Sequence, residues 1–237
     1  MQVSVIIPTY NEAKCLPQLL ECLRAQTFRD FEIIVADNKS TDGTQAIVAH
    51  YDAKLVAGGL PAHGRNSGVR SAQGEIIFFM DADVLCGPDF LQKNLAGFLA
   101  QKLDFAMVSF RTSSKNWFDK FNFNFQNAWI KYTRKIKPFT MGFGTVIKKE
   151  VFVKAHGYDE KMNLGEDADL GFRLDKAGFK FGILPEQLRV SARRFIKNGR
   201  VTHSIKMLWA GFTQSLGFNP NHHLDYEWGY EKKDKPE

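Results

Sequence analysis

The sequence is poor in cysteine and lacks any long apolar segment. Its three cysteines, Cys15, Cys22 and Cys86, are odd in number and do not stand at the spacing of metal ligands, which indicates a reducing compartment. No apolar run approaches the roughly 18 residues that a membrane span requires. The apolar stretch that begins at Val3 has no basic n-region or apolar h-region before it, so we expect no signal peptide. We therefore expect a cytoplasmic protein.

The common phosphate-binding motifs are missing as well. The loop at residues 8–12 contains no glycine, so the G-x-G-x-x-G fingerprint of dinucleotide-dependent dehydrogenases is absent where that fold needs it. The P-loop string is also absent. The net charge of +6 and the pI of about 9.1 favour phosphate-bearing partners. Zinc-finger spacings, RNP strings and a basic helix-turn-helix pattern are all missing, so we do not expect a nucleic-acid partner.

The first hundred residues alternate short apolar runs with amphipathic stretches. Leucines at 16, 19, 20 and 23 recur at i, i+3, i+4 and i+7, the spacing of one helix face. This alternation is typical of an α/β protein with a doubly wound, Rossmann-like, mostly parallel sheet and helices on both faces. The predicted strands are residues 3–7, 31–36, 54–57 and the stretch 76–84, and the helices between them start near residues 16, 44 and 63.

The stretch 76–84 carries two carboxylates at its end. Five apolar residues, 76–80, are followed by Asp81 and Asp83. If strand geometry continues, both carboxylates share one face at the carboxyl end of a buried strand, where open α/β sheets bind ligands. Paired carboxylate oxygens suit Mg²⁺ or Mn²⁺, and such an ion would neutralise the phosphates of a substrate. A solvated acidic turn would give the same short pattern.

Polar loops also follow the first two strands. Tyr10 and Glu12 follow the first strand and Asp37 follows the second, so these groups should share a sheet edge with Asp81 and form a nucleotide-sized crevice. Farther along, residues 164–177 predict a helix whose first turn holds three carboxylates. The helix macrodipole accounts for part of this acidity. The alternative is that one carboxylate is a general base facing the crevice.

Two later segments combine basic and aromatic residues. Between residues 105 and 149 Asp119 is the only acid, and an aromatic stripe recurs at helical spacing. The stripe fits a core-facing helix and a surface that meets a hydrophobic acceptor or a bilayer equally well. Residues 188–224 contain no acid and predict a basic amphipathic segment, which could dock on the core, meet a membrane or contact pyrophosphate. Peripheral contact at the inner face of the cell membrane is therefore an open alternative. The aromatic stripe between residues 105 and 149 consists of Trp117, Phe118, Phe121, Phe125, Ala128, Trp129 and Tyr132.

Five strings, taken together, resemble the family 2 glycosyltransferases, which are inverting nucleotide-sugar enzymes of the GT-A fold. They occur in the family's order and span most of residues 3–195. They are Val5-Ile6-Ile7-Pro8-Thr9-Tyr10-Asn11-Glu12, Asp37-Asn38-Lys39-Ser40-Thr41-Asp42-Gly43-Thr44, Arg65-Asn66-Ser67-Gly68, Asp81-Ala82-Asp83 and Gly165-Glu166-Asp167-Ala168-Asp169-Leu170.

The resemblance implies transfer of one sugar, with inversion, from a nucleoside-diphosphate sugar to an acceptor hydroxyl. It favours UDP over GDP and implies a divalent metal, Mg²⁺ or Mn²⁺. In one GT-A domain, residues 1–100 would form the donor-binding half and 101–187 the acceptor-binding half with the base. Residues 188–237 would form the basic tail.

Residue roles carry over position by position. Asp167 would deprotonate the acceptor, and Glu166 would position the acceptor or the base. Asp83 would hold the metal on the diphosphate, which Arg193 and Arg194 would steady. The remaining donor-site positions are Pro8, Thr9, Tyr10 and Glu12 around the nucleotide, Asp37 on the base, Arg65 beside the donor, and Asp81 with Ala82 near the ribose.

Two departures from the family pattern limit the inference. Asn38 replaces a second acid that relatives often carry in the loop that binds the nucleotide base, which weakens any inference about which nucleotide base is recognised. The Q-x-x-R-W string of processive synthases is missing, so we expect single-sugar transfer, to a lipid-linked or cell-envelope glycan precursor. The alternatives are a non-catalytic nucleotide-sugar-binding or membrane-adaptor protein and a sugar-1-phosphate nucleotidyltransferase. The nucleotidyltransferase needs a glycine-rich loop with arginine after the first strand, which residues 8–12 do not supply.

Overall fold

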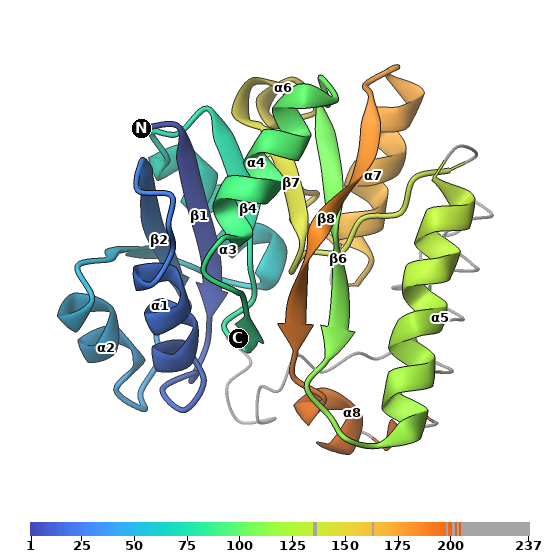
Figure 1. The fold of residues 1–237 in the computed structure, drawn as a ribbon. Coiled ribbons are helices and arrows are strands. Elements are labelled where there is room, and N and C mark those ends of the chain that lie inside the picture. The colour runs from blue at the N-terminus through green and yellow to red at the C-terminus, as the bar shows by residue number, and fades with distance from the viewer. Residues whose placement is uncertain (135–136, 163, 198, 201, 203, 205–237) are drawn as a thin grey trace.

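The computed structural model describes residues 1–134, 137–162, 164–197, 199–200, 202 and 204. An eight-stranded sheet runs through the molecule, with helices packed against it (Figure 1). The strands are β1 Val3–Thr9, β2 Phe31–Asp37, β3 Lys54–Ala57, β4 Ile76–Phe79, β5 Val84–Leu85, β6 Phe105–Thr112, β7 Thr145–Lys148 and β8 Phe181–Val190. The helices are α1 Leu16–Arg24, α2 Thr44–His50, α3 Pro61–Ser71, α4 Phe90–Ala100, α5 Trp117–Thr133, α6 Lys149–Lys154, α7 Glu166–Lys176 and α8 Arg193–Lys197.

The sheet order is β3-β2-β1-β4-β7-β6-β8-β5. The first four strands pair in parallel, as the alternation of strand and helix predicts. β7 is antiparallel to both β4 and β6, so β6 and its parallel neighbour β8 point the same way as β1. The carboxyl ends of β1, β2, β4, β6 and β8 therefore face one end of the sheet, at the bottom of Figure 1.

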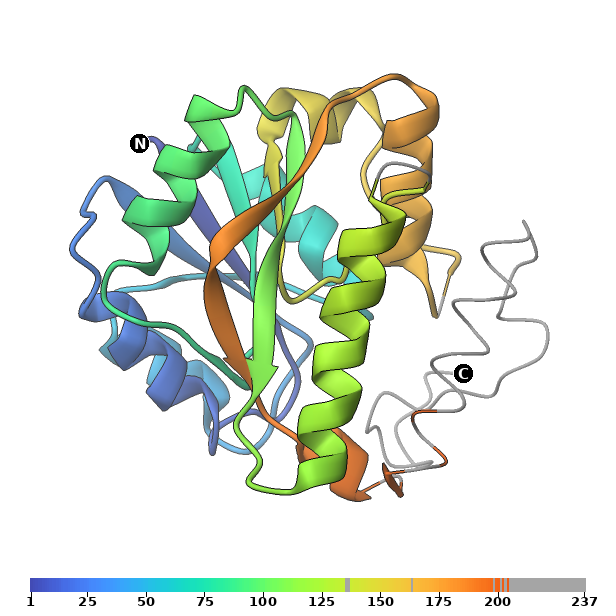
Figure 2. The ribbon, with the colours of Figure 1, turned by 45° about the vertical axis from the view of Figure 1, so that its right-hand side comes forward.

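Helices cover both faces of the sheet, which confirms the doubly wound architecture. One buried cluster joins the sheet to α1, α4 and the inner side of α5. A second cluster, on the opposite face, joins the sheet to α3, α6 and α7. The two views in Figures 1 and 2 show these layers. On α1, the four leucines of the predicted face are fully buried.

Strand β1 ends at Thr9, two residues beyond the predicted end at residue 7. Ile6 O accepts from Met80 N on the β4 side, whereas Thr9 O accepts from Asn38 N on the β2 side. Backbone groups of even-numbered residues thus face β4, and β4 ends at Phe79, opposite Ile6. The missing N–H of Pro8 therefore costs no ladder hydrogen bond, because no β4 residue pairs with it.

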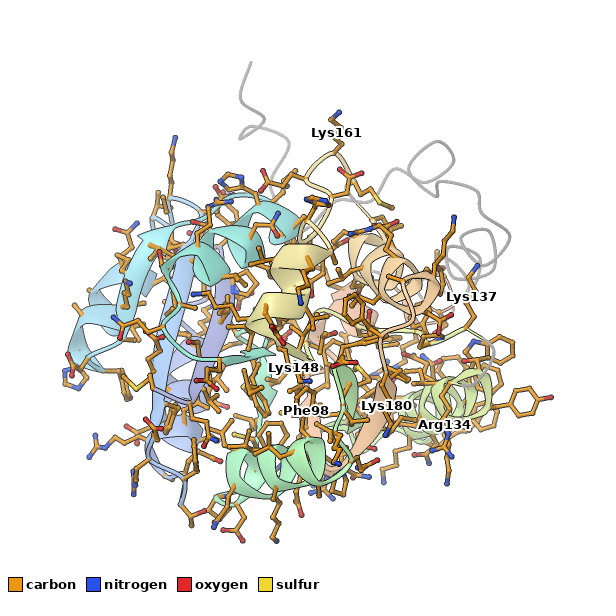
Figure 3. The ribbon with its side chains drawn as sticks, turned by 90° about the horizontal axis from the view of Figure 1, so that it is seen from above. Phe98, Arg134, Lys137, Lys148, Lys161 and Lys180 are labelled. Carbon is orange, nitrogen blue, oxygen red and sulfur yellow. The ribbon has the colours of Figure 1, made fainter. Side chains whose placement is uncertain are left out.

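The amino ends of the parallel strands lie at the other end of the sheet, which Figure 3 shows from above. There the Lys148 ammonium lies 2.7 Å from Asp104 Oδ1, and Asp104 Oδ2 accepts from Lys180 N. These contacts tie β6, β7 and β8 together on the side away from the acidic loops. None of the helices in the described part of the chain has the length and apolar character needed to cross a membrane.

The structure also contains strands that the sequence reading did not identify. β6 and β8 form a parallel pair with an irregularity between Val108 and Phe110. Residues 188–190, placed in the basic tail by sequence, are the last residues of β8. The sequence pattern of residues 142–147 predicts a further strand, but pairing begins only at Thr145, because residues 142–144 form a turn.

Candidate active site

The predicted site residues meet where β1, β2 and β4 end. Thr9 closes β1 and Asp37 closes β2, and the two are register partners in the parallel pair. Thr9 Oγ1 donates to Asp37 Oδ1 at 3.0 Å, and both side chains are buried. Tyr10 is half-buried at the start of the following loop.

Asp37 organises the loop that follows β2. Its Oδ1 accepts from Thr9 Oγ1 and from the Ser40 hydroxyl at 2.5 Å, and its Oδ2 accepts from Ser40 N at 2.9 Å and from Gln45 Nε2 at 2.8 Å. An ionised carboxylate offers about four acceptor positions, so these four donors saturate it. A nucleotide base that hydrogen-bonds to Asp37 must therefore replace one of these donors, and the exposed side chain of Gln45 is the easiest to displace.

Hydrogen bonds join the loops after β1 and β2. Asn11 N donates to the Ser40 hydroxyl at 2.8 Å, and Glu12 N donates to Thr44 Oγ1 at 3.0 Å. Asp42 Oδ2 accepts from Ala13 N at 3.0 Å. Side chains of the loop after β2 thus accept hydrogen bonds from the backbone of the loop after β1, and the two loops together form one wall of the site.

Arg65 of α3 is the most deeply placed cation of the site, with 3% of its surface exposed. Its Nη2 donates to Asp81 Oδ1 at 3.0 Å, and its Nη1 donates to Glu166 Oε1 at 2.9 Å. The Tyr158 ring lies 5.6 Å from the guanidinium carbon. Arg65 thus holds two carboxylates, and its place beside the donor stays a prediction.

A glycine makes room for this guanidinium. A Cβ atom at Gly142 would lie 2.1 Å from Arg65 Nη2, so the turn can approach Arg65 this closely only because residue 142 lacks a side chain. The same glycine donates its N–H to Asp167 Oδ2 at 2.9 Å. No pattern in the sequence indicates this role of Gly142.

The two acids at the start of α7 have different surroundings. Glu166 is 2% exposed and bound to Arg65, whereas Asp167 is half-buried and accepts from the backbone N–H groups of Gly142 and Ala168. Burial raises the pKa of Glu166 to about 7, and the charge of Asp167 adds to this rise while Arg65 opposes it. Burial also raises the pKa of Asp167, against the effect of Arg65 and the two backbone donors.

Asp81 and Asp83 do not share a strand face, contrary to the expectation from their spacing. β4 ends at Phe79, and Ala82 and Asp83 form a turn that leads into β5. Ala82 is buried within this turn. The turn directs Asp81 to Arg65, while Asp83 Oδ2 lies 3.4 Å from Arg193 Nη2.

Arg193 begins α8 and reaches back to the loop after β1. Its Nη2 lies 2.6 Å from Glu12 Oε1 and 2.9 Å from Glu12 Oε2, in addition to its contact with Asp83. The structure thus brings together three predicted site residues from the start, the middle and the end of the chain. The side chain of Arg194 lies outside the described part of the chain.

The donor atoms near Asp83 fit a divalent ion that is shared with a diphosphate. In the described part of the chain, no cluster of three His, Cys, Asp or Glu side chains could hold a metal by itself. Asp83 supplies carboxylate oxygen, the hard ligand that Mg²⁺ and Mn²⁺ prefer. Mg²⁺ commonly binds through one or two carboxylates and completes its shell with phosphates and water, so the residues present suffice for that mode.

Sequence comparisons connect this site to known proteins. Residues 4–155, more than half of the chain, match the profile described as Glycosyl transferase family 2. Validoxylamine A glucosyltransferase of Streptomyces hygroscopicus subsp. jinggangensis is 39% identical over 104 residues, which cover 40% of this chain and 25% of that protein. The amylovoran biosynthesis glycosyltransferase AmsB of Erwinia amylovora is 26% identical over 216 residues, 78% of this chain and 67% of that protein. The chain therefore spans only a quarter of the first of these relatives.

Solved structures share the fold. The TarS 1–349 fragment from S. aureus in complex with UDP-GlcNAc superimposes with a TM-score of 0.66 at 21% identity, over 81% of this chain and 58% of that one. The mannosyltransferase PcManGT from Pyrobaculum calidifontis, in complex with GDP-Man and Mn²⁺, gives a TM-score of 0.65 at 23% identity, over 78% and 56%. At these identities the likeness establishes the GT-A fold. Together with the family profile, it shows that the chain belongs to glycosyl transferase family 2.

Proposed function

We propose that the protein is an inverting glycosyltransferase that moves one sugar from a UDP-sugar to an acceptor hydroxyl. The observation that carries the proposal is the buried Arg65, which binds both Asp81, two residues after β4, and Glu166 beside Asp167. One guanidinium thereby fixes Asp81, an acid on the proposed donor side, relative to Glu166 at the start of α7. Single-displacement transfer needs a base and a donor site held in such a fixed relation.

In this proposal the donor nucleotide occupies the crevice formed by the loops after β1 and β2. Pro8, Thr9, Tyr10 and Glu12 line it, and Asp37 accepts from the base in place of the Gln45 amide. Asp81 and the buried turn at Ala82 approach the ribose. The names of two solved neighbours support a nucleotide-sugar donor, since TarS was solved with UDP-GlcNAc and PcManGT with GDP-Man.

Asp167 is the proposed general base. Its half-buried carboxylate is held by two backbone N–H groups, so it has a fixed orientation and some access to solvent. Glu166 is almost fully enclosed and bound to Arg65, which favours a positioning role for it. Attack by the deprotonated acceptor on the face opposite the leaving diphosphate would invert the anomeric centre, without a covalent intermediate.

The diphosphate end of the donor is assigned to Asp83, Arg193 and Arg194. A divalent ion, Mg²⁺ or Mn²⁺, would when bound neutralise charge on the leaving diphosphate. Asp83 would hold it, and Arg193, released from Glu12 and Asp83, would contact the phosphate oxygens. A nearby arginine supplies charge where charge develops in the transition state.

The acceptor is proposed to be a lipid-linked or cell-envelope glycan precursor, reached by peripheral contact with the membrane. Relatives named for cell-envelope chemistry support the glycan class. One is the poly(ribitol-phosphate) β-N-acetylglucosaminyltransferase TarS of Staphylococcus aureus, 38% identical over 109 residues. These residues are 19% of that protein, so its acceptor is a guide to class only.

A thermal-shift panel of UDP, GDP, dTDP and CDP, each with and without Mn²⁺, tests the donor site. A ligand at 100 times its dissociation constant stabilises the protein by roughly 2.7 kcal/mol. We expect UDP to give a metal-dependent shift that Asp83→Asn removes and that the distant variant Asp175→Asn retains. The absence of a shift with all four nucleotides would contradict the proposal.

A further inference from the structure

Helix α5 presents an aromatic face to the outside of the molecule. This face, called here the α5 aromatic face, consists of Trp117, Phe121, Phe125, Trp129 and Tyr132, which are 43–76% exposed. Phe125 and Trp129 stack with ring centroids 6.4 Å apart. Spacings of three and four residues place all five on one side of the helix. A contiguous set of large exposed aromatic side chains on one helix marks an interaction surface.

Polar contacts fix the helix in this orientation. Asp119 is fully buried, and its carboxylate oxygens lie 3.0 and 3.2 Å from Arg200 Nε. Asn122 Nδ2 donates to the Ser204 hydroxyl at 3.1 Å. On the next turn, the Asn127 side chain accepts from Phe110 N and donates to Phe110 O. Rotating α5 to bury its aromatic face would break these bonds and leave a buried charge without its partner.

The charge around the α5 aromatic face has one sign. Between residues 111 and 134 the sequence contains a single acid, Asp119, which is buried and paired with Arg200. The exposed side chains include Lys115, Lys120, Lys131 and Arg134, and Figure 3 shows Arg134 beside α5. Exposed Trp and Tyr rings with cations alongside are the combination that binds at the headgroup level of an anionic bilayer.

We propose that the α5 aromatic face is a docking surface for an anionic lipid bilayer. The aromatic rings would enter the headgroup region while the lysines and Arg134 meet lipid phosphates. This inference rests on the proposed function, and it identifies the surface that makes the membrane contact.

The position of α5 fits this role. β6 ends at Thr112 on the same end of the sheet as Asp37 and Asp81, so the first turn of α5 lies at the end of the sheet that carries the site. Arg200, which binds Asp119, follows α8 and Arg193 by only a few residues. A bilayer lying along α5 would therefore pass close to the site and present a lipid-linked acceptor there.

Flotation with vesicles of phosphatidylcholine alone, or mixed with phosphatidylglycerol, tests the proposal on the full chain. We expect binding only to the anionic vesicles, and weaker binding as salt increases. Two double variants, Trp117→Ser with Trp129→Ser and Lys120→Glu with Lys131→Glu, should each bind at least about tenfold more weakly. The matched controls Leu99→Ser and Lys161→Glu change exposed residues elsewhere and should bind as the wild type does.

Other occupants of the face give different results. Equal binding by the aromatic variants, or no binding by the wild type, would overturn the proposal. A dimer of the wild type that dissociates on substitution of these aromatic residues would also overturn it. The same holds if acrylamide fails to quench the fluorescence of Trp117 and Trp129 in the lipid-free monomer, because another part of the chain would then cover them. The nucleotide thermal shift, measured on the same variants, reports on the donor site independently of vesicle binding. Absence of that shift in the wild type would count against the proposed function, whereas loss of vesicle binding alone would not.

Discussion

Arg65 and Glu166, 101 positions apart in the sequence, form a buried ion pair with a distance of 2.9 Å between Nη1 and Oε1. The pair joins α3, in the part of the chain that binds the donor in our proposal, to the start of α7. Because Arg65 also holds Asp81, its removal takes the shared guanidinium away from two buried carboxylates.

We therefore expect Arg65→Met to lower the free energy of unfolding by about 3–5 kcal/mol, the cost of breaking a buried pair from one side. Arg70→Met, at an exposed position of the same helix, should change it by less than about 1 kcal/mol. Urea denaturation of both variants measures the difference. Equal stability of the two would show that Arg65 does not hold these carboxylates.

The raised pKa of Glu166 predicts a dependence of stability on pH. The folded state raises this pKa from 4.5 to about 7, so folding favours the protonated carboxyl. The resulting stabilisation is complete below pH 4.5 and is lost as the pH rises to about 7. Asp167, with its raised pKa, acts in the same direction.

Unfolding free energies of the wild type and Glu166→Gln at pH 5 and pH 8 test this directly. Relative to the glutamine variant, the wild type should lose stability between the two pH values. A wild type that gains stability relative to Glu166→Gln as the pH rises would refute the assignment.

The sequence predicts the parallel half of the sheet, β1 to β4, well because its signals are local. β3 has the predicted bounds, and α1 buries the predicted leucine face. The relation of Arg65 to Glu166 could not be predicted, because it depends on β7 inserting antiparallel between β4 and β6 and on the close approach of Gly142. No periodicity encodes a contact across that distance in sequence.

The orientation of α5 shows a second limit. Helical spacing identifies an amphipathic helix. The aromatic side and the opposite polar side repeat with the same period, so the spacing does not tell which of the two faces the core. The inner side includes Asp119 and Asn122, whose partners Arg200 and Ser204 lie about eighty residues later. Only those distant partners make a polar inner side stable, so the outward aromatic face could not be chosen from α5 alone.

Arg193 should compete with a divalent ion for Asp83. In the structure its guanidinium contacts Glu12 and Asp83, so removing the charge takes one competing cation away from each of these carboxylates. We expect Arg193→Gln to bind Mn²⁺ more tightly than the wild type without nucleotide, by up to about fivefold for a partly exposed pair. Electron paramagnetic resonance of free Mn²⁺ measures this, with Lys197→Gln on the same helix as the control. Unchanged or weaker Mn²⁺ binding by Arg193→Gln would contradict the competition.

Cys22 should be the most reactive thiol at neutral pH. A hydrogen bond from the Cys86 thiol lowers the pKa of Cys22 to about 6, whereas burial raises the pKa of Cys15. Alkylation by iodoacetamide, followed by mass spectrometry of each cysteine, should show a midpoint near pH 6 for Cys22. Cys86→Ala should move this midpoint upward, since it removes the donor. The same midpoint in both proteins would show that Cys86 does not activate Cys22.

Asp167 is, in our proposal, the general base of a glycosyl transfer. The direct measurement compares wild type, Asp167→Asn and Asp169→Asn for release of nucleoside diphosphate from the donor that binds, alongside the equilibrium affinity for that donor. Asp169 lies in the same turn of α7 but pairs with Arg173, so it is a matched control. We expect Asp167→Asn to retain donor affinity and lose turnover by about a hundredfold or more, and Asp169→Asn to retain both. Full turnover in Asp167→Asn would contradict the account.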